Sequence, residues 1–340
     1  MTRSRKRQSV DDLIDQWEPA LRQAFLESVY NIRDAAQLRY IQDAVARGDV
    51  DAVLESLKLN PASFRPLDRA LTAAFEAGGE SVTGALPSVE RPDGLSVEFQ
   101  FDVRNPAAET WLREHSSRSV SEILEDQRTL VREHLAAGMA AGNNPREVTI
   151  DLVGQVGASG RREGGVIGLT SSQAEWVRNY EDKLRSGTPT DALSYSLRDA
   201  RLDAAVRRAE ETGQPIPEDL LEKMVNSYEN RALRWRAESI GRTEAMAALH
   251  EAQSQSLKQA IESGDLSREA VTKIWRATHD KRTRDSHAVM DEQEVAMDEM
   301  FVTGAGNLLE YPGDPNGEPE ERIGCRCWME TRVDFLVGTE

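Results

Sequence analysis

The sequence has few cysteines, fewer basic than acidic residues, and no long apolar run. Its two cysteines, Cys325 and Cys327, are separated by one residue, and neighbours this close rarely reach the geometry of a disulfide bond. A disulfide-rich secreted domain is therefore excluded. No apolar run approaches the roughly 20 residues that span a bilayer, and no apolar stretch follows the basic N-terminus as in a secretory signal. We expect a cytosolic protein that does not enter a membrane.

Basic residues are too few for a protein that coats nucleic acid. The chain has 42 Lys and Arg against 59 Asp and Glu, a formal net charge of −17. Because phosphate neutralisation supplies most non-specific affinity for DNA, DNA binding over the whole surface is excluded. Local contact with DNA stays open at four basic residues near the start of the chain, which otherwise form a solvated tail: Arg3, Arg5, Lys6 and Arg7.

The composition and its periodicity predict a mainly helical body. The apolar fraction is 39% and the charged fraction 30%, which is typical of a packed core beneath a polar surface. Apolar residues recur at spacings of three and four, as on one face of a helix. Between the helices, the alternating residues 97–103 predict a short strand. The predicted helices cover residues 8–80, 105–142, 147–153, 170–184 and 191–212.

A long helix is predicted from residue 218 to about residue 263. Its N-terminal acidic residues suit the positive end of a helix dipole. An apolar seam runs along it and includes Trp235. The seam is interrupted at Gly241, where we expect the helix to be loosened.

The interruption also contains a charged residue, Arg242. An arginine in a packed seam needs a partner, because an unpaired buried charge is very costly. Glu238 and Glu244 are the local candidates. We interpret Arg242 as part of an ion pair that locks two helices together, and a catalytic or ligand-gripping arginine is the alternative.

After residue 264 the pattern changes from helical to mixed. A helical block followed by strands and short helices predicts an α+β fold, with a helical body, a long central helix and a small C-terminal module. We expect three segments: an N-terminal helical region with a basic tail and a linker (1–96), a helical body that ends in the long helix (97–264), and the α+β module (265–340). Within the module we expect strands at 273–278, 300–302, 308–311 and 327–333 and a helix at 283–294.

Metal-capable side chains gather in this module. Zinc takes four cysteine, histidine or carboxylate ligands, and closely spaced ligands are cheaper to order. Cys325 and Cys327 supply two ligands from one segment and His287 a third from another, with Asp280 or His279 as the fourth ligand. Two alternatives stay open: Cys325 packs in the interior and His287 hydrogen-bonds Asp280 or a loop carbonyl, or the two cysteines form a redox pair. The sequence leaves this open, and a structural zinc ion is the one cofactor that it suggests.

Catalytic sites have weaker support. A nucleophilic pair of His287 with one of the cysteines lacks a compelling orienting Asn or Asp. Three other histidines, His115, His134 and His250, lie on charged predicted helices without partners at ligand spacing, so we expect them on the surface. The sequence therefore predicts no catalytic residue.

The order of motifs in the last third of the chain resembles that of a known family. Gly-Arg-Thr-Glu at 241–244 is followed by Trp-x4-Asp-x3-Arg-x2-His at 275–287, then by a Pro/Gly/Asp-rich loop that ends in Gly-Cys-Arg-Cys at 324–327. This order resembles the phage head morphogenesis family, the minor head proteins similar to the F protein of phage Mu. The resemblance covers about residues 165–333. It implies eight signature residues: Arg242, Glu244, Trp275, Asp280, Arg284, His287, Cys325 and Cys327.

The resemblance implies a structural rather than an enzymatic role. Such proteins are low-copy or ring-like virion components at the portal vertex, where they act in capsid assembly, DNA packaging or ejection. The implied partners are the portal protein and the major capsid protein. The implied location is the virion head, and the host cytoplasm during assembly. Two alternatives stay open: a metal-dependent effector or hydrolase that uses His287 with Cys325 or Cys327, and a soluble scaffold that never enters the particle.

Overall fold

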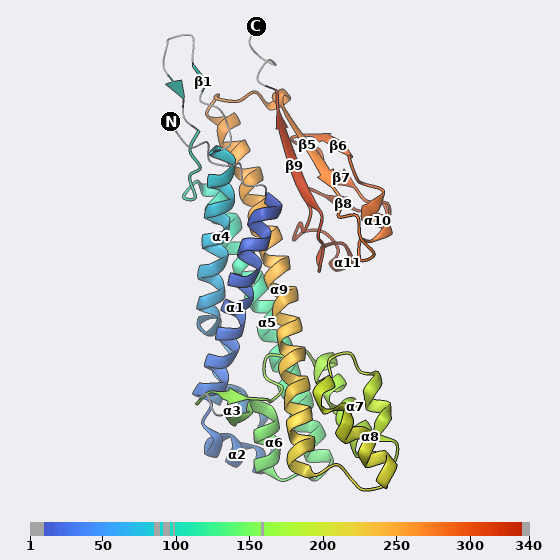
Figure 1. Cartoon of the computed structure of the whole chain (residues 1–340). Coiled ribbons are helices and arrows are strands. Elements are labelled where there is room, and N and C mark those ends of the chain that lie inside the picture. Colours follow the sequence, from blue (N-terminus) through green and yellow to red (C-terminus); the bar gives the residue numbers. More distant parts are fainter. Residues whose placement is uncertain (1–9, 85–88, 91–95, 98, 158–159, 335–340) are drawn as a thin grey trace, which may run out of the picture. The chain divides into compact units, whose positions relative to one another are not determined.

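The computed structural model describes residues 10–84, 89–90, 96–97, 99–157 and 160–334 (Figure 1). The basic cluster Arg3, Arg5, Lys6 and Arg7 lies outside these residues. No helix in the described ranges is long and apolar enough to cross a membrane. The described chain is mainly helical, with small antiparallel sheets, and the α+β class is therefore confirmed.

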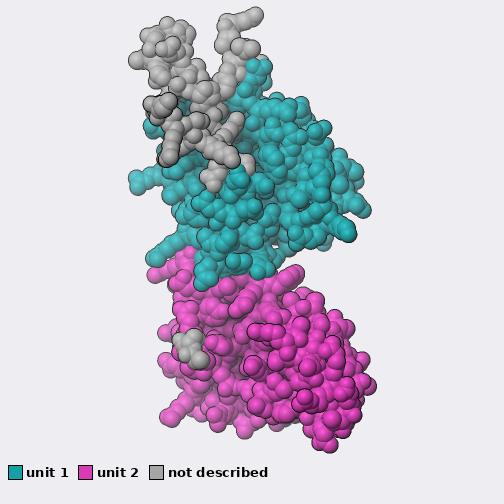
Figure 2. All heavy atoms as spheres, in the orientation of Figure 1, with its two compact units in different colours: residues 1–24, 67–117, 238–340 teal, residues 25–66, 118–237 magenta. Residues whose placement is uncertain are grey.

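The chain divides into two compact units, each made of separate chain segments (Figure 2). Unit 1 contains residues 1–24, 67–117 and 238–340, and unit 2 contains residues 25–66 and 118–237. This division differs from the three consecutive segments expected from the sequence. The reason is that four helices, α1, α4, α5 and α9, contribute residues to both units, so neither unit is a continuous stretch of chain.

The helices predicted before residue 264 are present, with one exception. The segment 191–212 is not one helix, because two 3-10 turns, η2 (Pro189–Ser194) and η3 (Ala200–Leu202), precede the short helix α8. The other helices begin and end within a few residues of their expected positions. The helices are α1 (Val10–Ala35), α2 (Leu38–Ala46), α3 (Val50–Ser56), α4 (Arg65–Thr83), α5 (Pro106–Ala140), α6 (Pro145–Val153), α7 (Ser171–Arg185), α8 (Asp203–Thr212) and α9 (Glu218–Glu262).

Local capping explains where several helices begin. At α5, the side chain of Asn105 accepts a hydrogen bond from the backbone N–H of Ala107, and Pro106 occupies the first helical position. At α7, Thr170 and Gln173 form a reciprocal capping box. These signals lie within four residues of each helix start, so the sequence alone locates these starts.

The strand expected at 97–103 is wrong for most of its length. Only Ser96–Val97 (β2) pairs, with Val89–Glu90 (β1), and residues 99–102 have no regular structure. The backbone of Asp102 bonds instead to the side-chain amide of Gln259 on α9, which accepts from its N–H at 2.9 Å and donates to its carbonyl at 3.0 Å. A side chain thus takes the place of a partner strand.

The glycine-rich loop of unit 2 is organised around one buried cation. Arg33 of α1 is 1% exposed and donates hydrogen bonds to the carbonyls of Gly164 (2.6 Å), Gly165 (2.9 Å) and Ile167 (2.9 Å). Burial lowers the pKa of Arg33 to about 10, against the opposing charge of Glu229. The loop carbonyls therefore find their hydrogen-bond donors on a helix more than a hundred residues away.

The C-terminal part of unit 1 is built on a three-stranded antiparallel sheet, with β5 (Val271–Arg276) between β6 (Glu294–Ala296) and β9 (Trp328–Val333) (Figure 1). The helix expected at 283–294 is wrong: α10 covers only Asp285–Ala288, and a turn with Glu292 at a positive φ of 64° leads into β6. The remaining elements are β7 (Phe301–Val302), β8 (Leu308–Leu309) and α11 (Pro319–Arg322).

A small apolar core joins this sheet to the end of α9. Buried side chains from the helix, such as Leu257, pack with Leu266 and with Val271 of β5. Upstream on the same helix, His250 is fully buried and accepts a hydrogen bond from the backbone N–H of Met329 at 3.1 Å. Apolar packing and one buried hydrogen bond therefore both attach α9 to the sheet.

Gly241 on α9 allows a close approach of α1. A Cβ atom at this position would lie 2.8 Å from the backbone nitrogen of Arg22 and 2.8 Å from the carbonyl oxygen of Glu18. Both atoms belong to the backbone, which moves less readily than a side chain. The expectation that Gly241 loosens the helix misses its role, because α9 continues through it and the missing side chain makes room for α1.

We predict that Gly241→Ala lowers the free energy of unfolding by up to about 2 kcal/mol. The added methyl overpacks the helix contact at a cost of about 1–3 kcal/mol, and the better helix propensity of alanine offsets about 1 kcal/mol of that cost. Urea denaturation measures the change. Gly187→Ala is the matched control, since a Cβ there meets nothing within 4 Å. Unchanged or increased stability of Gly241→Ala would contradict the prediction.

Burial of His250 predicts a dependence of stability on pH. Burial lowers the pKa of His250 from 6.5 to about 4, so the folded protein holds the neutral ring. The stability that this residue contributes is complete above pH 6.5 and is lost as the pH falls toward 4, because the unfolded chain binds the proton more readily.

Between pH 6.5 and pH 4.5, we expect His250→Gln to lose roughly 2 kcal/mol less free energy of unfolding than the wild type. Glutamine retains a hydrogen-bond acceptor for Met329 but cannot take up a proton in this range. Equal losses in the two proteins, measured by urea denaturation at both pH values, would show that His250 does not carry this dependence.

Candidate functional site

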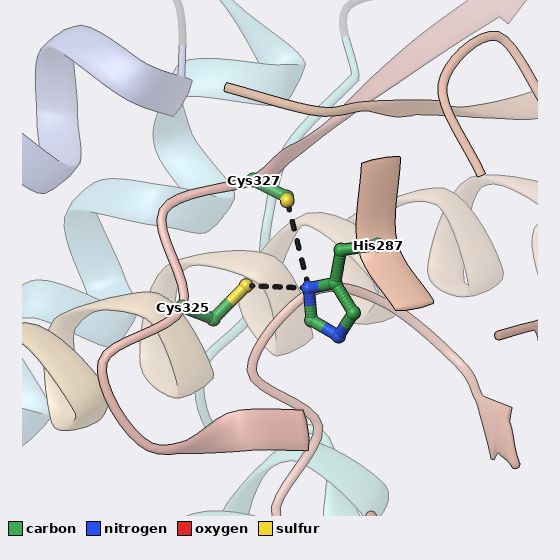
Figure 3. Close-up of side chains that lie close together, drawn as sticks. All are labelled: His287, Cys325 and Cys327. Carbon is green, nitrogen blue, oxygen red and sulfur yellow. Dashed lines mark hydrogen bonds between the residues drawn. The ribbon is translucent and has the colours of Figure 1, made fainter. Parts of the chain in front are cut away.

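Three of the predicted metal ligands meet in one buried group (Figure 3). His287 lies in α10, and the two cysteines lie just before β9. Nδ1 of His287 is 3.4 Å from Sγ of Cys325 and 3.6 Å from Sγ of Cys327. The three ligand atoms lie within 4.8 Å of one another, and each residue is at most 2% exposed. We refer to these residues as the His–Cys–Cys group.

Backbone contacts hold the two segments of the group together. The hydroxyl of Thr278, after β5, donates a hydrogen bond to the carbonyl of Arg326, between the two cysteines. Arg276 of β5 is opposite Trp328 of β9, so the cysteine segment leads directly into the sheet. The ring of Trp275 packs edge-on against His287, with centroids 5.2 Å apart. The sheet therefore fixes where the thiols and the imidazole lie.

A carboxylate lies behind the imidazole. Nε2 of His287 is 2.9 Å from Oε2 of Glu321, but it lies off the direction of a straight hydrogen bond and has no other hydrogen-bond partner. Although burial opposes it, hydrogen bonds from Asn307 and Ser286 lower the pKa of Glu321. An ionised carboxylate beside Nε2 favours the tautomer that carries its proton there, which leaves the lone pair of Nδ1 facing the sulfur atoms.

The two thiols differ in acidity because they interact. A hydrogen bond with the Cys325 thiol lowers the pKa of Cys327 below its ordinary value, against the effect of burial. The same hydrogen bond, together with burial, raises the pKa of Cys325 well above its ordinary value. A thiolate is both the nucleophilic and the metal-binding form of cysteine. The group therefore has the donors for a soft metal ion.

The two residues expected as a fourth ligand are bound elsewhere. The carboxylate of Asp280 pairs with the guanidinium of Arg326, which also holds the pKa of Asp280 below its usual range. His279 is exposed, and its Nε2 lies 3.0 Å from Oδ2 of Asp291. Among the described residues, the group that could hold a metal ion consists of His287, Cys325 and Cys327 and includes neither of these side chains.

The space beside the group is small. In the described part of the chain, the cavity that His287 and Cys327 line has a volume of about 10 Å³. This is enough for one water molecule and far too little for an organic substrate. The other lining residues are Arg282, Thr283, Arg284, Gly324 and Arg326.

The partners expected for Arg242 are wrong. Its guanidinium pairs with Glu18 of α1 at 2.9 Å and donates to the carbonyl of Cys325 at 3.2 Å. Glu238 instead contacts Arg22 at 3.5 Å, and Glu244 contacts His115 of α5 at 2.7 Å. The partners come from other helices because the polar positions of α9 face its neighbours. The interpretation of Arg242 as an ion pair between two helices is confirmed.

Other signature residues are also structural contacts. Trp275 is fully buried and packs against Phe301 as well as His287. Arg284 donates to the carbonyl of Ile323, near the cysteines. The contact of Arg284, like that of Arg242, attaches a backbone carbonyl in or near the cysteine segment to another element of unit 1.

The three histidines expected on the surface are not exposed. His115 is 6% exposed and His250 is fully buried, while His134 is partly buried and hydrogen-bonded to the carbonyl of Val148 at 3.4 Å. Burial lowers the pKa of His134 to about 4. The sequence did not reveal their burial, because each histidine lies among charged residues but on the packed face of its helix. His115, which pairs with Glu244, and His250, which accepts from the N–H of Met329, are structural contacts that the sequence analysis missed.

We predict that Arg242→Ala lowers the free energy of unfolding by roughly 1.5–3 kcal/mol, since it removes charged hydrogen bonds to Glu18 and to the carbonyl of Cys325. The matched control is Arg234→Ala, an exposed arginine on the same helix. Thermal or urea denaturation of both variants measures the difference. Equal stability of the two variants would mean that Arg242 does not attach α1 and the cysteine segment to α9.

Comparison with known proteins identifies the family. Residues 129–330, more than half of the chain, match the family described as phage Mu protein F like protein. The matched region contains all eight signature residues. Neither the curated proteins nor the solved structures yielded a match. The chain belongs to the phage Mu F-like family of phage head morphogenesis proteins.

Proposed function

We propose that this protein is a minor head protein of a tailed bacteriophage, a structural component associated with the portal vertex. It acts in capsid assembly, DNA packaging or ejection, and it is not an enzyme. Membership of the phage Mu F-like family supports a role in the head. The position at the portal vertex and the step in which the protein acts go beyond what family membership supports, and both are proposed here.

A structural role is supported by the contacts of the family's signature residues, which bind other groups of the protein. Arg242 and Arg284 donate to backbone carbonyls, and Asp280 pairs with Arg326. Trp275 packs against the imidazole of His287. Within the described part of the chain, these side chains bind protein groups and do not surround a substrate-sized cavity; the space beside the His–Cys–Cys group is about 10 Å³. A hydrolase that used this group would need an open site, so we do not favour the enzymatic alternative.

A surface suited to binding another protein lies on unit 2. Trp176 of α7 and Trp235 of α9 are 37% and 50% exposed and meet edge to face, with ring centroids 5.8 Å apart. The sequence placed Trp235 in the buried apolar seam of α9. This prediction is wrong, because the side chain is exposed. With Tyr195 and Tyr228, the two tryptophans line a groove of about 500 Å³, which we call the aromatic groove. Exposed aromatic residues are enriched at protein interfaces.

We assign the aromatic groove to the portal protein, and the major capsid protein is a second partner in the proposal. The basic cluster Arg3, Arg5, Lys6 and Arg7 is the segment assigned to DNA. The net charge of −17 supports this restriction, because an acidic surface discourages adhesion to packaged DNA elsewhere.

Purified particles test the proposal. We expect mass spectrometry to find the chain in finished virions at low copy number, and a particle map to show it at the portal vertex. Virions that lack the chain, or a chain found throughout the capsid shell, would overturn the proposal. Multiple-turnover hydrolysis abolished by His287→Ala at an unchanged melting temperature would support the enzymatic alternative instead.

The role of the aromatic groove is tested by complementing a phage that lacks the gene. The double variant Trp176→Ala and Trp235→Ala should fold normally and be incorporated into virions at least tenfold less, because aromatic anchors contribute about 2 kcal/mol or more at interfaces. Tyr40→Ala is the matched control, since Tyr40 is also 45% exposed on unit 2 but lies outside the groove. Wild-type incorporation of the double variant would contradict the assignment.

A further inference from the structure

We propose that Nδ1 of His287 and the Sγ atoms of Cys325 and Cys327 bind one zinc ion, which fastens α10 to the segment before β9. The inference concerns the stability of unit 1 and does not depend on the role of the protein in the phage head. It rests on the distances, the directions and the burial of the three side chains.

The distances match those of a zinc centre. Zinc binds cysteine sulfur at about 2.3 Å and histidine nitrogen at about 2.0–2.1 Å in a tetrahedron, which separates the nitrogen from each sulfur by about 3.6 Å. Nδ1 of His287 lies 3.4 Å and 3.6 Å from the two sulfur atoms. A zinc ion therefore fits between the three atoms without moving any of them far.

Both sulfur atoms face the same nitrogen (Figure 3). A neutral imidazole nitrogen offers one lone pair, so it accepts one good hydrogen bond and not two. The two thiols therefore cannot both donate well to Nδ1, and the thiol that does not has only the other sulfur, a weak acceptor, to bond to. A shared cation between the three atoms satisfies all of them at once.

The surroundings of the group support a metal ion. Glu321 lies 2.9 Å from Nε2 of His287, the position in which a carboxylate commonly orients a metal-bound histidine. Glu321 is 4% exposed and is itself held by Ser286 and Asn307. A neutral histidine and two thiolates bring a charge of −2, which a zinc ion cancels. The buried group would then carry no net charge.

The fourth position belongs to one water molecule. Asp280 and His279 are bound to Arg326 and Asp291, so they are not available as ligands. The cavity of about 10 Å³ next to His287 and Cys327 has room for a single water. A water ligand in so small a space gives a closed, structural centre, even though only three ligands come from the protein.

Metal analysis of the purified full-length chain tests the inference. We expect about one zinc per chain and, after exchange for cobalt, the near-ultraviolet absorption of thiolate-bound cobalt. His287→Ala, Cys325→Ser and Cys327→Ser should each lose the metal. His279→Ala is the matched control, an exposed histidine eight residues away that should retain zinc. A folded wild-type protein that takes up neither metal from added zinc or cobalt chloride, or a disulfide between the cysteines, would overturn the inference.

Two further measurements cover the case in which the ligand variants do not fold. A chelator should lower the melting temperature of the wild type, and added zinc chloride should restore it. Glu321→Gln should fold and bind zinc about 10–100-fold more weakly, because the residue orients the imidazole without touching the metal. Zinc affinity unchanged by Glu321→Gln, together with a melting temperature indifferent to the chelator, would show that bound zinc lies elsewhere.

Discussion

The close approach of α1 to α9 at Gly241 is the constraint on which the arrangement of unit 1 depends. Without a side chain at this position, the backbone of α1 comes within reach of the next residue, Arg242. Arg242 then joins Glu18 of α1 to the carbonyl of Cys325. One contact between helices thus also positions the segment that carries both cysteines, and a larger residue at 241 would disturb all three parts together.

Several buried polar groups of unit 1 bind partners on other elements, and these bonds give the unit its specificity. Glu244 contacts His115 of α5, and His250 binds the backbone of β9. Apolar packing tolerates small shifts, whereas an unsatisfied buried polar group costs about 1–3 kcal/mol. The same principle applies within unit 2, where Arg33 satisfies three loop carbonyls. The long helix is therefore polar in composition and largely buried at the same time.

The His–Cys–Cys group follows from this architecture. The antiparallel pairing of β5 with β9 brings residue 276 opposite residue 328, and this places the cysteine segment beside the strand that precedes α10. Trp275 and Glu321 then fix the imidazole from two sides. Such rigid burial suits a group that holds chain segments together, and it agrees with a family whose members build phage heads.

The sequence by itself determined most of the helices, their caps, the α+β class, the family and the three residues of the group, because periodicity, capping and motif order depend on residues near one another in the chain. Only the tertiary structure decided the partners of Arg242, the burial of His115 and His250, and the exposure of Trp235. It also decided that residues 99–102 form no strand, since Gln259 supplies their hydrogen bonds. Apart from the exposure of Trp235, these outcomes depend on contacts between residues more than 75 positions apart. A local sequence pattern carries no information about which distant group will be the partner.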